Sequence, residues 1–429
     1  MTSGASTELG PNPLAAGEQN ISVAEARAAI HASLKAIADI QTVALAAASG
    51  RVLAADVISP IDVPAHDNAA MDGYAFAGAA LRPGRALSLR SVGPTILAGQ
   101  PAARDLGDGD CVRIMTGAVM PGGLDTVVPI ELCRVDGDQV SIPPDVIRTG
   151  ENRRRRGEDL AAGRPALRTG SVLRPADIGL AASLGLTALA VRRPLRVAVF
   201  STGDEVQPPG QPLAPNCIYD SNRFALIAAL QRLGMEPVDL GLVRDDPLAL
   251  RAVLAQATTR ADAVVTSGGV SAGDADYVRG VLDELGQVTF WKVAMRPGRP
   301  VAFGPLRAGD QRTTWLFALP GNPVAALVTF YVFAREALLE LAGAAPRPLP
   351  VLQARSTSAL RKRPGRTEYQ RGIVRLGDDG HWQVERIQSQ GAGVLRSMSE
   401  ANALIVLGHD QGSVAVGDPV DVWLFDGLV

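Results

Sequence analysis

The segment Ala263-Val264-Val265-Thr266-Ser267-Gly268-Gly269-Val270-Ser271-Ala272-Gly273-Asp274-Ala275-Asp276 decides the fold of the chain around it. It begins as a short apolar run, which predicts a buried strand, and it turns through two glycines into a stretch with helical spacing. Such a turn presents backbone N–H groups to an anion. Because its two final aspartates would repel an anion, we expect a phosphate-type ligand together with Mg²⁺. An ordinary strand-to-helix turn with an aspartate cap is the alternative.

Length and composition indicate a multidomain globular protein. The chain has 429 residues, of which 47% are hydrophobic and 20% charged. A net charge of −2 favours neither nucleic acid nor an anionic membrane as partner. The N-terminus has no secretory signal pattern, and no apolar run is long enough for a membrane span. Three scattered cysteines predict free thiols, so the sequence predicts a cytoplasmic protein.

Alternating patterns along the chain predict an α/β plus β protein with several domains. Ser22 and Glu25 form a capping-box pattern that opens a helix to about Ile40, and Asp136-Gly137 predicts a hairpin. Strands alternate with helices after residue 193, which predicts a central, doubly wound, mostly parallel sheet. The predicted units are a disordered tail (1–20), a discontinuous mixed α/β N-terminal domain (21–60 and 148–192), an inserted small β domain (61–147), the α/β domain (193–345) and a C-terminal β domain (346–429).

One helix of the α/β domain is predicted from Asp220 to Leu233. Its apolar residues recur at helical spacing, which predicts a buried face. The residues on that face are Phe224, Ile227, Leu230 and Leu233.

Three predicted strands of the α/β domain end in unusual loops, at Phe200–Glu205, Thr266–Asp276 and Leu319–Pro323. The carboxyl ends of parallel strands meet at one edge of a sheet, so these loops should lie together. They supply hydroxyls, free N–H groups, a Pro-bounded turn and several carboxylates, which favours a phosphate-bearing ligand with Mg²⁺. No G-x-G-x-x-G opens a helix here and no Walker-type P-loop is present, which argues against hydride-transfer and P-loop enzymes.

Further charged residues are expected near the same edge. Asp246 can cap a helix that starts at Pro247, which leaves Asp245 as the freer carboxylate. Lys292 lies in a predicted strand, and the Pro/Gly-bounded loop from Arg296 to Pro300 follows it. This loop is either a polar turn or a cationic loop that holds an oxyanion.

Eight motifs occur in the order in which they occur in the molybdopterin molybdotransferase family, whose eukaryotic relatives include the C-terminal part of gephyrin. The motifs are Asp67–Ala75, Arg113–Ala118, Arg156–Asp159, Phe200–Glu205, Arg244–Pro247, Thr266–Ser271, Lys292 with Pro297-Gly298, and Pro320–Pro323. The chain resembles this family over residues 21–429. Two departures are Arg296 and Arg299, which stand where many relatives have lysine.

The resemblance implies an elongated homodimer of four domains, in which the C-terminal domain is a β-barrel. It implies insertion of molybdenum from molybdate into the dithiolene of adenylylated molybdopterin, with Mg²⁺-dependent release of AMP. The implied catalytic residues are Asp72, Thr116, Asp159, Glu205, Asp245, Asp276, Lys292 and Arg296, of which Glu205 and Asp276 would hold the metal. The implied substrate-binding residues are Ser201, Thr202, Gly203, Ser267, Gly268, Gly269, Val270, Ser271, Pro320, Gly321, Asn322 and Pro323.

The same resemblance implies that each site is built from two subunits. Asp72, Thr116 and Asp159 of one chain would face the α/β domain of the other. Two other functions remain open. One is the preceding adenylylation of molybdopterin, although the enzyme of that step resembles the α/β domain alone. The other is a non-enzymatic pterin carrier or scaffold on the same fold, which the carboxylate set disfavours.

Overall fold

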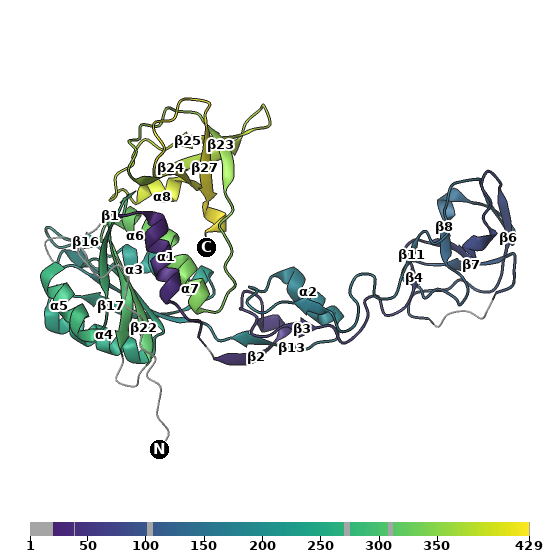
Figure 1. Ribbon diagram of the computed structural model, residues 1–429, viewed down its shortest axis with the longest axis horizontal. Helices are drawn as coiled ribbons and strands as arrows, with labels where there is room; N and C mark the ends of the chain where they lie inside the picture. Colours follow the sequence, from purple (N-terminus) through teal and green to yellow (C-terminus); the bar gives the residue numbers. More distant parts are fainter. Residues whose placement is uncertain (1–19, 38, 101–105, 270–274, 308–311, 429) are drawn as a thin grey trace, which may run out of the picture.

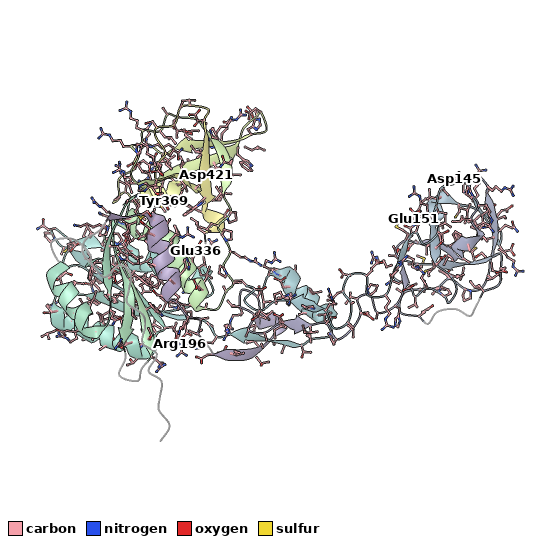
Figure 2. All side chains as sticks on the ribbon, viewed as in Figure 1. Asp145, Glu151, Arg196, Glu336, Tyr369 and Asp421 are labelled. Carbon is pink, nitrogen blue, oxygen red and sulfur yellow. The ribbon has the colours of Figure 1, made fainter. Side chains whose placement is uncertain are left out.

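The structure is a computed structural model that describes residues 20–37, 39–100, 106–269, 275–307 and 312–428. It is elongated: an α/β unit and a barrel lie at one end, and an arm leads from them to a small β unit at the other (Figure 1). Figure 2 shows Asp145 and Glu151 on the far β unit and Arg196 on the α/β unit, at opposite ends of the molecule. Within the described residues, no helix is both long and apolar enough to cross a membrane.

The α/β unit is built on a seven-stranded sheet. Its strands, in spatial order, are β1 (Asn20–Ile21), β19 (Thr289–Val293), β21 (Pro300–Arg307), β22 (Thr313–Leu319), β18 (Ala263–Ser267), β14 (Arg196–Thr202) and β17 (Glu236–Val243). Only β21 runs antiparallel to its neighbours, so the predicted mostly parallel sheet is confirmed. Since β14, β18 and β22 are adjacent and parallel, their carboxyl ends lie on one edge.

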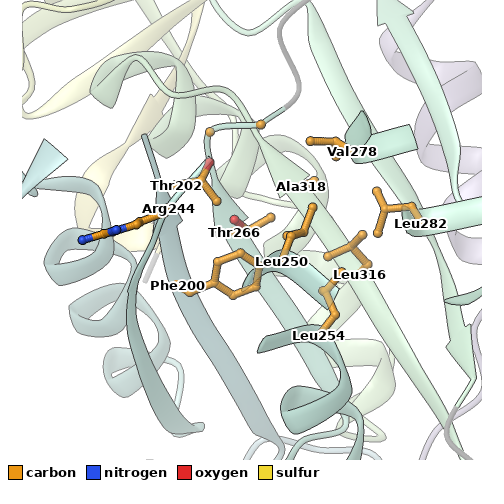
Figure 3. A pocket seen from close by; sticks show the side chains of 12 residues that line it. Phe200, Thr202, Arg244, Leu250, Leu254, Thr266, Val278, Leu282, Leu316 and Ala318 are labelled. Atoms are coloured by element: carbon orange, nitrogen blue, oxygen red, sulfur yellow. The ribbon is translucent and has the colours of Figure 1, made fainter. Parts of the chain in front are cut away.

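Helices cover both faces of this sheet, as a doubly wound fold requires. One face carries α1 (Val23–Ser33), α3 (Asn222–Arg232), α6 (Pro323–Thr329) and α7 (Arg335–Leu341), and the other carries α4 (Pro247–Arg260) and α5 (Ala275–Leu285). Successive residues of β14 alternate between the two cores: Val199 lies in the first, and Ala198 and Phe200 in the second. Figure 3 shows the second core, where Phe200, Leu254 and Leu316 pack beneath Thr202 and Thr266.

The N-terminal segment packs differently from its predicted domain assignment. The capping box is present, since the Glu25 N–H donates to Ser22 Oγ at 3.2 Å. However, the helix ends at Ser33 instead of about Ile40, and residue Asn20 of the predicted tail lies in β1. Ile30 is buried in the first core of the sheet, so residues 20–33 belong to the α/β unit by packing. Residues 1–19 of the tail lie outside the described residues.

The predicted apolar face of α3 is also wrong in one position. Phe224 is 46% exposed, and the buried residues are Arg223, Leu226, Ala229 and Leu230. Arg223 turns inward because Asp220 binds its guanidinium, and it takes the buried position predicted for Phe224, whereas Ile227, Leu230 and Leu233 pack on the core as predicted. The Phe224 ring covers the outer side of that guanidinium, 4.5 Å from the ring centroid.

The arm consists of short strand pairs and a helix. Its strands are β2 (Ile40–Ala44) paired with β13 (Ala188–Arg192), and β3 (Val57–Ile58) paired with β12 (Pro165–Leu167); its helix is α2 (Pro175–Ser183). Beyond them, β4 (Asn68–Ala69) pairs with β11 (Arg153–Arg154). The far β unit contains β5 (Gly73–Phe76), β6 (Leu87–Ser91), β7 (Asp110–Ile114), β8 (Thr126–Pro129), β9 (Arg134–Asp136) and β10 (Gln139–Ile142). The pairing of β9 with β10 confirms the predicted hairpin at Asp136-Gly137.

The C-terminal region is a closed barrel, as expected from the resemblance. Its strands are β24 (Thr367–Leu376), β25 (Trp382–Arg386), β23 (Leu352–Ser356), β27 (Pro419–Leu424) and β26 (Ala403–Leu407), and pairing of β26 with β24 closes it. β20 (Met295–Arg296) pairs with β24 and attaches the barrel to the α/β unit. Glu336 of α7 and Tyr369 of β24 lie close to this junction in Figure 2.

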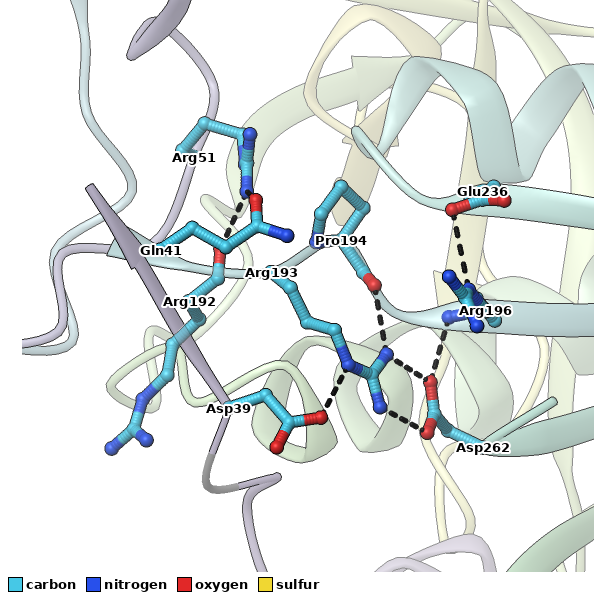
Figure 4. A network of polar contacts seen from close by, with 9 residues as sticks. All are labelled: Asp39, Gln41, Arg51, Arg192, Arg193, Pro194, Arg196, Glu236 and Asp262. Atoms are coloured by element: carbon cyan, nitrogen blue, oxygen red, sulfur yellow. Dashed lines mark hydrogen bonds and ion pairs between the residues drawn. The ribbon is translucent and has the colours of Figure 1, made fainter. Parts of the chain in front are cut away.

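A polar network fixes the arm to the α/β unit (Figure 4). Arg193 follows β13, and its guanidinium donates to both carboxylate oxygens of Asp262, at 2.6 and 2.7 Å. Its Nε donates to Asp39 at 2.6 Å, which ties the start of the arm to the same point. The Asp262 carboxylate also accepts from the N–H of Arg196, at 2.8 Å. Since the Arg193 and Asp262 side chains are only 17% and 18% exposed, this fork–fork pair holds the junction firmly.

We predict that Arg193→Ala lowers the free energy of unfolding by about 2 kcal/mol, because it leaves a mostly buried carboxylate without its cation. Arg196→Ala is the matched control. Its guanidinium pairs at 3.5 Å with Glu236, and both side chains are more than half exposed, so a loss below about 0.5 kcal/mol is expected. Urea denaturation measures both values, and equal losses would contradict this assignment.

Candidate functional site

A cavity of about 430 Å³ opens at the carboxyl edge of the sheet. The described parts of the three loops predicted to meet there do so, together with the segment after β17. The predicted residues that line the cavity are Ser201, Thr202, Gly203, Glu205, Asp245, Ser267, Gly268, Gly269, Gly321, Asn322 and Pro323. Pro320 lies directly behind it and accepts a hydrogen bond from Ser267 Oγ at 3.4 Å.

Some predicted residues cannot be placed at the cavity. Val270 and Ser271 lie outside the described residues. Asp276 is the second residue of α5, but only its backbone is described, so the predicted carboxylate pair of Glu205 and Asp276 stays a prediction. Within the described residues, no cluster of three or more metal-ligating side chains occurs.

Glycines let the loop backbones approach one another closely. Gly268 and Gly269 have φ angles of +99° and +71°, which side chains with a Cβ rarely adopt. A Cβ on Gly268 would lie 2.7 Å from Thr202 Oγ1, and a Cβ on Gly321 would lie 3.7 Å from Gly268 Cα. The floor of the cavity is therefore backbone from two strand ends in direct contact, which leaves room for a ligand with several oxygens.

The hydroxyls at the cavity divide into two kinds. Ser201 Oγ donates to Asp220 at 3.0 Å, and Ser267 Oγ accepts from Asn222 Nδ2 at 2.6 Å, so the protein already uses both. Thr202 Oγ1 and Thr266 Oγ1 are buried and have no hydrogen-bond partner among the described residues. Figure 3 shows these two threonines above the apolar pocket of about 20 Å³ that underlies the loops. Unpaired buried hydroxyls are uncommon, which makes them candidates for ligand or water contacts.

Residues that the sequence analysis did not select complete the cavity wall. Asp220, Ser221 and Asn222 line it from the start of α3, and Gly393 and Leu395 from the barrel. The run Asp220-Ser221-Asn222 is a polar signal at the start of a predicted helix, but it belongs to none of the eight motifs that marked the site. Nothing in the pattern near Gly393 indicated a contact with a sheet so far away along the chain.

A buried arginine holds the barrel segment in place. Arg371 of β24 donates to the carbonyl oxygens of Ser389 and Gly391, at 3.1 and 3.0 Å. The Val324 N–H, in the first turn of α6, donates to the Ala392 carbonyl at 3.0 Å. Burial, with the nearby charges of Arg386 and Arg296, lowers the pKa of Arg371 to about 10. The barrel thus closes one side of the cavity through the segment that Arg371 holds.

The two cations predicted for this edge do not line the cavity. Lys292 is in β19. Because β19 and β22 are both antiparallel to β21, they run in the same direction and the carboxyl end of β19 lies at the same edge of the sheet. Arg296 is exposed in β20, and in the strand register it lies opposite Glu368 of β24. Neither belongs to the residues that line the cavity.

Asp72, Thr116 and Asp159 lie on the arm and far β unit, which Figure 1 shows extending away from the α/β sheet. One carboxylate oxygen of Asp72 accepts from both the hydroxyl and the N–H of Thr116, at 2.7 Å each. These bonds, the hydroxyl first, hold the pKa of Asp72 below its usual range. Their stabilisation is present above the ordinary carboxyl pKa and is lost as the pH falls through the lowered one. Asp159 is exposed, and its N–H donates to Val63 O at 3.1 Å.

Comparison with known proteins agrees with this architecture. Three family profiles match in order: the MoeA N-terminal region (domain I and II) over residues 21–185, a probable molybdopterin binding domain over 198–340, and the MoeA C-terminal region (domain IV) over 353–425. A molybdopterin molybdenumtransferase of Haemophilus influenzae is 39% identical over 383 residues, which cover 89% of this chain and 93% of that protein. The chain belongs to the molybdopterin molybdenumtransferase family.

Other members of the family match over similar lengths. Molybdopterin molybdenumtransferase 2 of Mycobacterium tuberculosis is 38% identical over 398 residues, covering 89% of this chain and 94% of that one. Among solved structures, a molybdopterin biosynthesis moeA protein from Pyrococcus horikoshii OT3 has a TM-score of 0.79 at 25% identity and covers 95% of this chain and 100% of its own. The family is one of transferases, and the members named here match this chain over more than nine-tenths of their own length.

We predict that Gly268→Ala lowers the free energy of unfolding by about 3 kcal/mol, through backbone strain and the clash with Thr202. Gly210→Ala is the matched control, because Gly210 has a φ angle of +100° but nothing within 4 Å of an added Cβ. Only the strain of about 1 kcal/mol is expected there. Urea denaturation compares the two variants, and a Gly268→Ala variant as stable as the control would show that the loops do not touch.

Proposed function

We propose that this protein inserts molybdenum from molybdate into the dithiolene of adenylylated molybdopterin and releases AMP. The observation that carries the proposal is the cavity at the carboxyl ends of β14, β18 and β22. There, a floor of glycine backbone faces the carboxylates of Glu205 and Asp245. A glycine floor suits a phosphoanhydride, whose oxygens need close, fixed N–H dipoles.

The donor set of the cavity fits Mg²⁺. Glu205 and Asp245 line it, and Mg²⁺ is usually held by one or two carboxylates together with waters and substrate phosphates. We propose Glu205 and Asp276 as metal-binding residues, with Asp245 beside them. The bound metal would neutralise the charge that develops on the phosphates as the anhydride breaks.

The residues of the chain itself would do the remaining work. Gly268, Gly269 and Gly321 would hold the phosphate groups of the anhydride, and Asn322 and Pro323 would form another wall of the site. Molybdate is a dianion, so cations are needed beside the dithiolene. We assign this role to Lys292 and Arg296.

We propose that a second copy of the chain completes the site. Asp72, Thr116 and Asp159 lie on an extended arm, away from the cavity of their own chain (Figure 1). In a two-fold dimer the arm of each chain can reach the cavity of the other, since the same surfaces meet twice. Asp72 suits a role at a charged ligand, because Thr116 keeps its carboxylate ionised and oriented.

We also propose that the protein works in the cytoplasm. All three cysteines are free, and Cys111 is buried in the core of the far β unit. Burial raises the pKa of the Cys111 thiol to about 12, so it stays protonated and unreactive. Free thiols support a reducing compartment.

The test is incubation of the purified protein with adenylylated molybdopterin, molybdate and Mg²⁺, followed by measurement of AMP. We predict AMP release that needs both molybdate and Mg²⁺. Glu205→Gln and Asp276→Asn should each lower the rate at least about 100-fold, because each removes a charge from the metal site. Glu236→Gln removes an exposed carboxylate elsewhere on the sheet and should leave the rate unchanged.

Three results would contradict the proposal. AMP release without molybdate would show that cleavage of the anhydride does not depend on the insertion of molybdenum. Pterin binding without turnover would favour the carrier function. Consumption of ATP with molybdopterin would favour the adenylylation step.

A further inference from the structure

Asn222 occupies a central place at the cavity that the proposed chemistry does not explain. It is the first residue of α3, on a different element from the loops that form the cavity floor. Its side-chain nitrogen donates to Ser267 Oγ and to the Gly321 carbonyl oxygen, both at 2.6 Å. One amide group therefore joins the ends of β18 and β22, which carry Gly268-Gly269 and Gly321.

The chemistry of its partners fixes the orientation of this amide. A carbonyl oxygen can only accept, so the atom that faces Gly321 must be the NH₂ group. Ser267 Oγ in turn lies 3.4 Å from the Pro320 carbonyl and donates to it. The short bond from Asn222 occupies an acceptor site of the Ser267 hydroxyl, and the long contact to Pro320 is the direction in which this hydroxyl can donate within the protein.

The base under Asn222 is rigid. Asp220 is buried, with a side chain only 1% exposed, and it accepts from Ser201 Oγ at 3.0 Å and from Arg223 Nε at 2.8 Å. The Asp220 N–H donates to Gln207 O at 2.9 Å. The hydrogen bonds to Asp220 and Asp239 outweigh the effect of burial and raise the pKa of Arg223, so this ion pair stays charged. The third strand end, that of β14, is thus tied to the same helix start through Ser201.

We propose that Asn222 is a positioning residue that sets the spacing of the phosphate-holding loops for the proposed reaction. It acts through Ser267 and the Gly321 carbonyl, and it touches neither the metal nor the reacting atoms. A neutral amide is needed there: it donates to both loops without adding a charge near the phosphates. The inference rests on the proposed function for its ligand, but the tie between the loops can be tested without any ligand.

The first measurement is hydrogen–deuterium exchange on the free protein. In Asn222→Ala, exchange in the segments ending β18 and β22 should rise about tenfold, because both loops lose their shared donor. Gln231→Ala, an exposed position on the same helix, should leave exchange at the wild-type rate. Unchanged exchange in Asn222→Ala would overturn the proposal.

The second measurement compares the binding of AMP and adenosine by calorimetry. Asn222→Ala should weaken AMP binding about tenfold and leave adenosine binding unchanged, because only AMP carries the phosphate that the loops hold. Asn222→Asp, nearly isosteric, should weaken AMP about 100-fold through its added charge. If Asn222→Ala fails to fold, Asn222→Ser takes its place, with a smaller loss expected.

The outcomes separate this inference from the proposed function. Equal weakening of AMP and adenosine, or no weakening of either, would overturn the positioning role. Wild-type protein that binds AMP but never releases it from adenylylated molybdopterin would refute the proposed function only. A double-mutant cycle with Ser267→Ala should be strongly non-additive for AMP, since both residues act along one chain of hydrogen bonds; additive effects would count against it.

Discussion

The parallel alignment of β14, β18 and β22 is the constraint on which the rest of the site depends. Each of these strands is buried on both faces, because residues alternate between two cores. That double burial leaves only the strand ends free to carry polar groups. Thr202, Ser267 and Leu319 end the three strands side by side, so the loops that follow them must share one edge. The cavity is a consequence of this register, and glycine allows the loop backbones that form its floor to approach one another closely.

The second constraint is the connection between distant parts of the chain. Arg193 and Asp262 join the arm to the α/β unit, and the pairing of β20 with β24 joins the barrel to it. The barrel in turn reaches the cavity through the segment that Arg371 holds. A single chain therefore presents an open cavity walled by two units and an arm directed away from it. This geometry supports the proposal that a second subunit supplies Asp72 and Asp159 to the cavity.

Much of the fold followed from local patterns. The apolar run of β18, the capping box at Ser22 and the cap at Asp246 are short-range signals, and each is present in the structure. Wherever a long-range contact decides the outcome, the sequence was less informative. Phe224 has the spacing of a core residue, but Arg223 also pairs with Asp239 of the distant strand β17 and takes the buried position, so the aromatic ring stays outside. The strand at Asn20–Ile21 joins a sheet partner at Lys292, hundreds of positions away, which no local pattern encodes.

The site shows the same division. Gly268 and Gly269 could be predicted as site residues because adjacent glycines mark a tight turn. Asn222 could not, because its role depends on two hydrogen-bond partners that follow other strands. The central claim is that each cavity is completed by the arm of another chain, and subunit mixing tests it most directly. Asp72→Asn and Glu205→Gln chains, each inactive alone, would be combined and assayed for molybdate-dependent AMP release. A shared site in a two-fold dimer predicts recovery of about a quarter of the wild-type rate. At equal mixing about half of the dimers contain both variants, and each of these has one intact site out of two. Recovery no higher than the sum of the two separate variants would contradict it.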